Sequence, residues 1–276
     1  MPFIFGLALC VMLAPFGAMA APNYSRIELL AAAAGEGDGG PILLGIRIEP
    51  RPGWKTYWRA PGESGLPPVF TFRVHDNTGQ PQIKWPAPKR LILQGLESYG
   101  YDGPVIFPFY VQPQDAAKPV RLEIEADYAV CMDICVPEQA ALHLTLPPGS
   151  ASATPDHEAL RAALARVPRQ QDENSQPRIR AAYVRQNGAN VILLVQAETR
   201  QGFQAPDLFA DGPADLLFSA PQIGYLSGKH QATFSLTVTQ LDPSQPVIGQ
   251  TVTLTLVDGE IAVEKHVKLA EQARTE

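Results

Sequence analysis

VRLEIEADY, the stretch Val120–Tyr128, alternates apolar and charged side chains from its first residue to Asp127. Successive side chains of a β-strand point to opposite faces of the sheet, so this period of two predicts a strand with one face in a core and the other in solvent. This strand is the first indication of a β fold.

Similar short runs extend on both sides of this stretch, separated by turns rich in Gly and Pro. They lie at residues 26–33, 41–48, 105–111 and 140–146, and again at 179–185, 191–196, 216–219, 233–239, 251–257 and 261–269. Asn187-Gly188 and Asp258-Gly259 each join two such runs, and these dipeptides favour tight hairpin turns. The pattern predicts antiparallel sheets in both halves of the chain.

One helical pattern interrupts the strands. Thr154 can cap a helix with Pro155 at its first position. The apolar positions recur at helical spacing and the pattern stops at Pro168; they are Leu160, Ala163, Leu164 and Val167. We therefore expect an all-β protein with two immunoglobulin-like antiparallel β-sandwich domains, residues 21–148 and 178–276, joined by a short helix and a polar linker, residues 149–177.

The composition limits the possible partners. Of the 276 residues, 45% are hydrophobic and 18% are charged, which is ordinary globular usage and excludes a disordered chain. The formal net charge is −6 and no segment concentrates Lys or Arg, so we expect no nucleic-acid partner.

The N-terminus has the features of an export signal. Residues 3–18 are almost wholly apolar, and Ala18-Met19-Ala20 has the small residues that signal peptidase requires, so residues 1–20 are predicted to be a cleaved signal peptide. No later apolar run approaches the roughly 18 to 20 residues that span a bilayer. We expect an exported chain without a membrane span after cleavage.

Two cysteines stay in the mature chain, because Cys10 lies within the signal peptide. Three residues separate Cys131 from Cys135, a spacing that allows an intramolecular disulfide at a corner between two strands. Closing so short a loop contributes only about 2 kcal/mol, little for a domain with its own core. The residues alone leave three interpretations: a redox pair, a structural disulfide or a metal site.

The neighbours of the cysteines bear on these interpretations. Asp133 and Glu138 are acidic, and no cationic side chain lies nearby in sequence to favour a thiolate. Cys131, Met132 and Cys135 are soft ligands suited to Cu(I), which is the metal alternative. We predict no other cofactor.

Four segments of the first half are distinctive in combination: Gly53–Pro68 (GWKTYWRAPGESGLPP), Trp85–Pro88 (WPAP), Tyr99–Tyr101 (YGY) and Cys131–Pro137 (CMDICVP). Together they resemble the N-terminal domain of the DsbD/ScsB family of periplasmic thiol-disulfide reductases. The resemblance covers roughly residues 27 to 146, and its segments are specific in combination.

The resemblance implies an immunoglobulin-like sandwich in which Cys131 and Cys135 are the redox pair and Cys135 forms the mixed disulfide with partners. It implies a loop that shields the disulfide, at Glu97, Tyr99 and Tyr101, although Ser98 replaces the aromatic residue of the best-known branch. The implied partners are a thioredoxin-like or membrane-embedded thiol reductase as donor and disulfide-containing proteins of the periplasm as acceptors. Part of the family is also associated with copper tolerance.

Other side chains have simpler interpretations. We expect the aromatic residues of the first half to pack mainly in the core rather than to line a partner groove; they are Trp54, Tyr57, Trp58, Phe70 and Phe72. His143 is the histidine that strand 140–146 could bring near the thiols.

Overall fold

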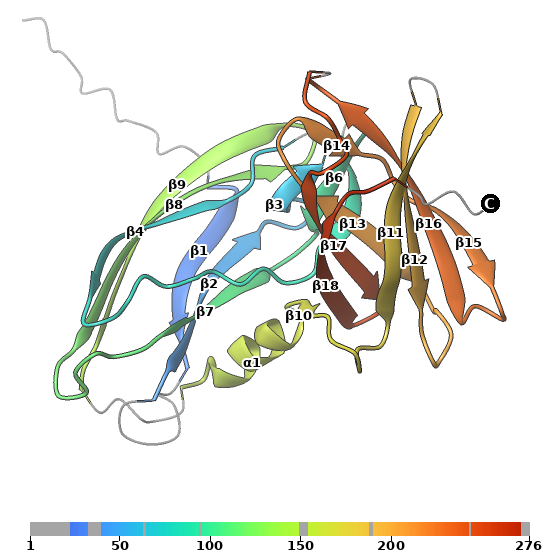
Figure 1. Cartoon of the computed structure of the whole chain (residues 1–276). Helices are drawn as coiled ribbons and strands as arrows, with labels where there is room; N and C mark the ends of the chain where they lie inside the picture. Colours follow the sequence, from blue (N-terminus) through green and yellow to red (C-terminus); the bar gives the residue numbers. More distant parts are fainter. Residues whose placement is uncertain are drawn as a thin grey trace, which may run out of the picture.

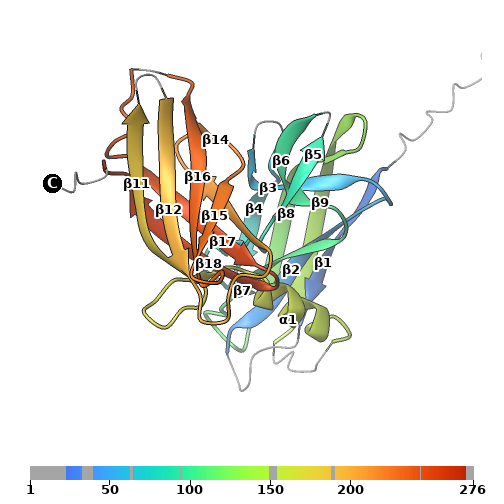
Figure 2. The same ribbon diagram turned by 90° about the vertical axis from the view of Figure 1, so that its right-hand side faces the viewer.

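The structure, a computed structural model, describes residues 23–32, 40–62, 65–93, 95–148, 154–187, 190–242 and 244–271. The predicted signal peptide, residues 1–20, lies outside the described residues. Figures 1 and 2 show the strands of the two halves of the chain as two groups lying side by side, with the single labelled helix at one end.

The first group of strands forms the N-terminal sandwich. Its smaller sheet has the order β1 (Ser25–Ala31), β2 (Ile42–Pro50), β7 (Val105–Val111). Its larger sheet has the order β4 (Val69–Asp76), β8 (Val120–Cys131), β3 (Lys55–Gly62), β6 (Leu96–Tyr101), β5 (Lys89–Leu93), and β9 (Cys135–Leu146) also pairs with β8. The core lies between these two sheets, where Ile46 and Phe109 of the smaller sheet pack in one buried cluster with Leu122 and Ile124 of β8.

The second group forms the C-terminal sandwich. One sheet has the order β10 (Arg169–Gln170), β18 (Ile261–Lys268), β17 (Thr251–Asp258), β13 (Pro206–Asp211). The other has the order β11 (Arg178–Asn187), β12 (Asn190–Glu198), β16 (Gln231–Gln240), β14 (Leu216–Phe218), and β15 (Gln222–Leu226) pairs with β16. A single buried cluster, which includes Leu193, Phe234 and Leu254, fills the space between them.

The predicted fold class is confirmed. Along β8 the apolar positions from Val120 to Ala126 are buried and the charged positions from Arg121 to Asp127 are exposed, as the period of two requires. The run at Asp258-Gly259 joins β17 to β18 in an antiparallel hairpin, with Asp258 opposite Ile261. In the C-terminal half the predicted runs 233–239 and 251–257 lie within β16 and β17.

The segment between the sandwiches differs in two ways from the prediction. The helix α1 spans His157–Ala165, with Asp156 as its N-cap residue in place of Thr154. The Thr154 hydroxyl instead donates to the carbonyl oxygen of Ala31, which ties this residue to the end of β1. In addition, Arg169 and Gln170 of the predicted linker form β10, because they pair in parallel with β18.

Helix α1 packs on the N-terminal sandwich through its apolar face. Leu160 is fully buried against Leu30 of β1 and Leu43 of β2. Within the described ranges, no helix has both the length and the apolar character needed to cross a membrane.

Candidate functional site

Cys131 and Cys135 lie at a hairpin between the two longest strands of the N-terminal sandwich. Cys131 is the last residue of β8 and Cys135 the first of β9, and the two residues are opposite each other in the register. Their sulfurs form a disulfide, with the Cα atoms 4.1 Å apart. The loop between them is closed by a hydrogen bond from the Met132 N–H to the Ile134 carbonyl, 3.0 Å long.

The two cysteines differ in their access to solvent. Cys131 is 1% exposed, because β8 is flanked there by both β3 and β9 and its alternating pattern gives way to continuous burial from Ala129 onward. Cys135 is exposed, and so are the apolar side chains of Met132 and Ile134 beside it. Of the two cysteines, Cys135 is therefore the more accessible to a thiolate approaching from solvent.

Tyr57 of β3 contacts both sulfurs. Its Oη atom lies 2.9 Å from the Cys131 Sγ and 3.2 Å from the Cys135 Sγ. Burial raises the pKa of the Tyr57 hydroxyl, so the group keeps its proton and can donate it in a hydrogen bond. Tyr57 is buried, as predicted, but its contact with the sulfurs was not predicted.

The ring of Tyr57 is covered by the loop that follows β3. Gly65 lies so close that a Cβ atom there would come within 2.2 Å of the ring, and its φ of +138° favours glycine. This loop, from the segment that resembles the DsbD/ScsB family, covers the tyrosine.

The fold also brings a cation to the sheet face that holds the disulfide. Lys55 is opposite Cys131 in the register between β3 and β8, and residues directly opposite in a sheet share a face. On the same sheet, a hydrogen bond from Lys89 and the charge of Lys55 hold the pKa of the Asp102 carboxyl below its usual range. The position of Lys55 opposite Cys131 was not predicted, since the two residues are distant along the chain.

A second contact fixes the hairpin to the start of the chain's first strand. The Glu138 carboxylate accepts a hydrogen bond from the Tyr24 N–H at 2.7 Å, one from the Tyr128 hydroxyl at 2.9 Å, and one from the Ser25 hydroxyl. These bonds tie β9, three residues beyond Cys135, to the beginning of β1.

The residues predicted to shield the disulfide make other contacts. Tyr99 and Tyr101 are buried, and their hydroxyls donate to the carbonyls of Phe218 and Pro86, respectively. Gly100, between them, is opposite Tyr57 in the register, so period two places both tyrosines on the other face of the sheet. Glu97 forms an ion pair with Arg90.

His143 lies far from the thiols. It is eight residues along β9 from Cys135, roughly 27 Å at the usual rise of a strand, and faces Glu123. The expectation that its strand brings it near the cysteines is wrong, because β9 begins at Cys135 rather than at residue 140.

The metal alternative depends on the redox state of the pair. In the disulfide the two sulfurs are bonded to each other, so Cys131, Met132 and Cys135 would offer a Cu(I) ligand set only after reduction. Across the described residues, no group of three or more His, Cys, Asp and Glu side chains has the arrangement of a metal site.

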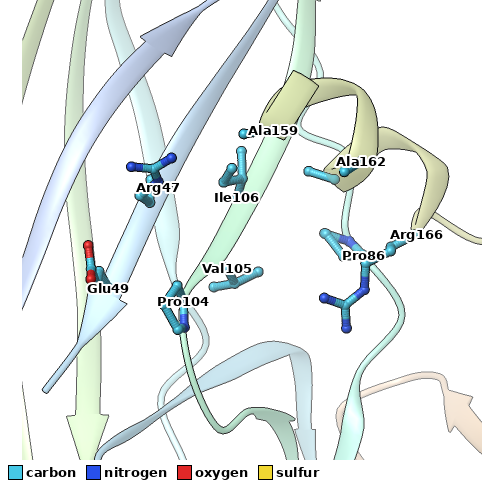
Figure 3. Close-up of a pocket in the computed structure, with 10 residues that line it drawn as sticks. Arg47, Glu49, Pro86, Pro104, Val105, Ile106, Ala159, Ala162 and Arg166 are labelled. Carbon is cyan, nitrogen blue, oxygen red and sulfur yellow. The ribbon is translucent and has the colours of Figure 1, made fainter. Parts of the chain in front are cut away.

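A cavity of about 330 Å³ lies elsewhere, between α1 and strands β2 and β7. Figure 3 shows Arg47 and Glu49 on one side of it and Arg166 on the other. Its lining includes neither cysteine and not Tyr57, so it is separate from the hairpin.

Comparisons with known proteins divide the chain into two parts. Residues 29–147 match the family model described as thiol:disulfide interchange protein DsbD, N-terminal, and residues 166–272 match a domain of unknown function (DUF8393). No curated protein matches the chain.

Among solved structures, the N-terminal periplasmic domain of ScsB from Proteus mirabilis has the same fold. The TM-score is 0.72 and the sequences are 22% identical, over 92% of this chain and 97% of that one. Both sandwiches are therefore included in the shared fold.

Proposed function

Because residues 29–147 belong to the family of DsbD N-terminal domains, we propose that this chain is a thiol-disulfide interchange module that acts in the periplasm. The observation that carries the proposal is the geometry of the disulfide: one exposed cysteine, one buried cysteine, and a tyrosine hydroxyl within hydrogen-bonding distance of both sulfurs. A disulfide that served only to hold the hairpin would need neither the access nor the hydroxyl.

Reduction of the module begins with the thiolate of a donor dithiol, which attacks the Cys135 sulfur. The bond between the two cysteines breaks, and Cys131 leaves as a thiolate that accepts a hydrogen bond from Tyr57. The donor's second thiol then attacks the donor sulfur of the mixed disulfide and releases Cys135. The donor is oxidised by two electrons and the module is reduced by two.

The second half of the cycle oxidises the module. The Cys135 thiolate attacks the disulfide of an acceptor protein and forms a new mixed disulfide. Cys131 then attacks the Cys135 sulfur, which restores the bond between the cysteines and releases the reduced acceptor. The proposed donor is a thioredoxin-like or membrane-embedded thiol reductase, and the proposed acceptors are disulfide-containing proteins of the periplasm.

The first test is the reduction potential of the pair, measured by equilibrating the protein in glutathione or dithiothreitol buffers and counting alkylated thiols by mass. We expect a value between about −180 and −270 mV, the range of exchanging dithiols. A value below about −300 mV would assign the bond a structural role and overturn the proposal.

The second test uses the unequal exposure of the sulfurs. A Cys131→Ser variant keeps the exposed Cys135 and should accumulate mixed disulfides with a thioredoxin-like partner. The matched variant Cys135→Ser keeps only the buried Cys131 and should accumulate at least about tenfold less, as judged on non-reducing gels. Equal trapping by both variants would contradict the roles given to the two sulfurs.

The same protein distinguishes the copper alternative. Reduced protein that retains Cu(I) in a one-to-one ratio, and loses it in a Met132→Leu variant, would favour a copper-binding role. The interchange role needs no such retention and predicts that Met132→Leu leaves the reduction potential unchanged.

A further inference from the structure

Arg59 of β3 connects the N-terminal sandwich to the C-terminal one. Its Nε atom donates to the Asp211 carboxylate of β13 at 3.1 Å, and its Nη2 atom donates to Glu264 of β18. Glu264 is 8% exposed and also accepts a hydrogen bond from Thr255 at 3.1 Å. The arginine is therefore held by carboxylates that are themselves fixed within the sheet β10-β18-β17-β13.

Arg90 of β5 makes a second connection. Its Nε and Nη2 atoms bind both oxygens of Asp207 in β13, at 3.1 and 2.9 Å, and Nη2 also donates to the Leu208 carbonyl at 3.2 Å. The guanidinium stacks over the rings of Tyr99 and Phe209, with its Cζ atom 4.9 and 5.1 Å from their centroids. A bidentate pair of this kind fixes both distance and orientation.

The two sandwiches also share a core. Phe209 of β13 is 1% exposed and belongs to the buried cluster of the N-terminal sandwich. Its ring centroid lies 6.1 Å from that of Trp58 in β3 and 5.1 Å from that of Tyr99 in β6. The second sandwich thus supplies a side chain to the core of the first.

These contacts converge on the strand that carries Tyr57. Trp58 and Arg59 follow it directly in β3, and Arg59 lies about 7 Å along the strand from Tyr57 at the usual rise per residue. Figure 2 shows β3, β5 and β6 on the side of the N-terminal sandwich that faces the C-terminal strands.

We propose that the C-terminal sandwich positions β3 and so holds the Tyr57 hydroxyl at the two sulfurs. Arg59, Asp211 and Glu264 are then positioning residues for the exchange reaction, and the matched domain of unknown function has a role in the redox step. This inference rests on the proposed function, because it concerns the same disulfide.

The test is a double variant of the full chain, Asp211→Asn with Glu264→Gln, which removes both charges from Arg59 with little change of volume. The rate of disulfide reduction by dithiothreitol should fall about threefold or more, a coupling in the range found for residues in contact. Glu198→Gln is the matched control, since Glu198 pairs with Arg178 and Arg180 within the C-terminal sandwich, and it should reduce at the rate of the unaltered protein.

The same rate measured in a Tyr57→Phe background distinguishes positioning of the hydroxyl from a merely structural role. If the contacts act through the hydroxyl, the double variant should cause almost no further slowing once that hydroxyl is absent. A double variant that melts at a lower temperature but reduces at the original rate, or that slows reduction equally in both backgrounds, would overturn the inference.

A second variant provides the test if the double variant does not fold. Arg59→Lys keeps the charge but cannot bind two carboxylates in a fixed fork, so it should also slow reduction. Because this comparison measures the rate of reduction by excess dithiothreitol and not the potential of the pair, it gives a result even if the measured potential excludes the interchange role.

Discussion

In the proposed exchange reaction, single residues decide which sulfur leaves and which is attacked. Cys131 is buried and is the proposed leaving group, Cys135 is exposed and is the proposed point of attack, and Tyr57 Oη is placed to stabilise the thiolate that would form. Without this hydrogen bond, a buried thiolate would lose a donor that compensates for the loss of water. The hydroxyl is thus the group on which the rate should depend most.

The prediction for this residue is that Tyr57→Phe slows reduction by dithiothreitol by about tenfold or more, since a hydrogen bond to a charged group contributes about 1.5–3 kcal/mol. The melting temperature of the oxidised protein should change far less than the rate. The measurement is stopped-flow or quenched alkylation kinetics at pH 8. An unchanged rate would remove Tyr57 from the mechanism.

The cysteine pair could be predicted from the sequence, but the tyrosine could not. Cys131 and Cys135 are neighbours along the chain, so their spacing alone shows that a disulfide between them is possible. Tyr57 lies 74 residues from Cys131, and only the pairing of β3 with β8 brings the two together. The face on which Tyr99 and Tyr101 lie is likewise set by strand pairing, here between β3 and β6, which the sequence alone does not show.

Strands were predicted where an apolar run or a period of two marks them, and were missed where neither does. Residues 105–111 are an apolar run and have the bounds of β7, whereas β3 mixes buried Tyr57 and Trp58 with Lys55 and Arg59, and every side chain of β4 is half-buried or exposed. The strand β9 begins at Cys135, whereas the predicted run begins at residue 140. Pro137 lies between the two starting points, and a proline argues against a strand. Proline is tolerated there since β9 pairs with β8 alone among the described strands, which makes it an edge.

The close approach of β3 and β6 gives a prediction at the level of elements. A Cβ atom on Gly100 would lie 2.1 Å from the Thr56 carbonyl oxygen and 3.0 Å from the Tyr57 Cα, so Gly100→Ala must push β6 away from β3. We expect a loss of about 1–3 kcal/mol in the free energy of unfolding and a slower reduction of the disulfide.

The matched control for this substitution is Gly79→Ala, where an added Cβ meets nothing within 4 Å. Urea denaturation of both variants, with dithiothreitol kinetics on the same samples, makes the comparison. Equal stability of the two variants would contradict the tight contact between the strands.

The whole molecule should respond to alkaline pH through its buried tyrosines. Burial raises the pKa of Tyr57, Tyr99, Tyr101 and Tyr128 in the folded state. In the unfolded chain these groups titrate near pH 10, so above that value the unfolded state binds fewer protons than the folded one. Their contribution to stability is therefore complete below about pH 10 and is lost as the pH rises further.

The measurement is the free energy of unfolding in urea at several pH values between 8 and 11. We expect the decline above pH 10 to become shallower in Tyr101→Phe, which removes one of the titrating groups. Tyr110→Phe, at an exposed position, is the control. A free energy that stays level to pH 11 would show that these hydroxyls ionise without cost in the folded protein.

The position of Phe209 in the core of the N-terminal sandwich has a consequence for the engineering of this protein. Because its ring completes the core of the neighbouring sandwich, the boundary between the two domains in sequence is not a boundary in packing. The N-terminal sandwich transplanted alone would have an unfilled space in its core where the Phe209 ring packs, and Arg59 and Arg90 would lose their carboxylate partners in β13. A chimera that preserves this packing should therefore be cut outside both sandwiches.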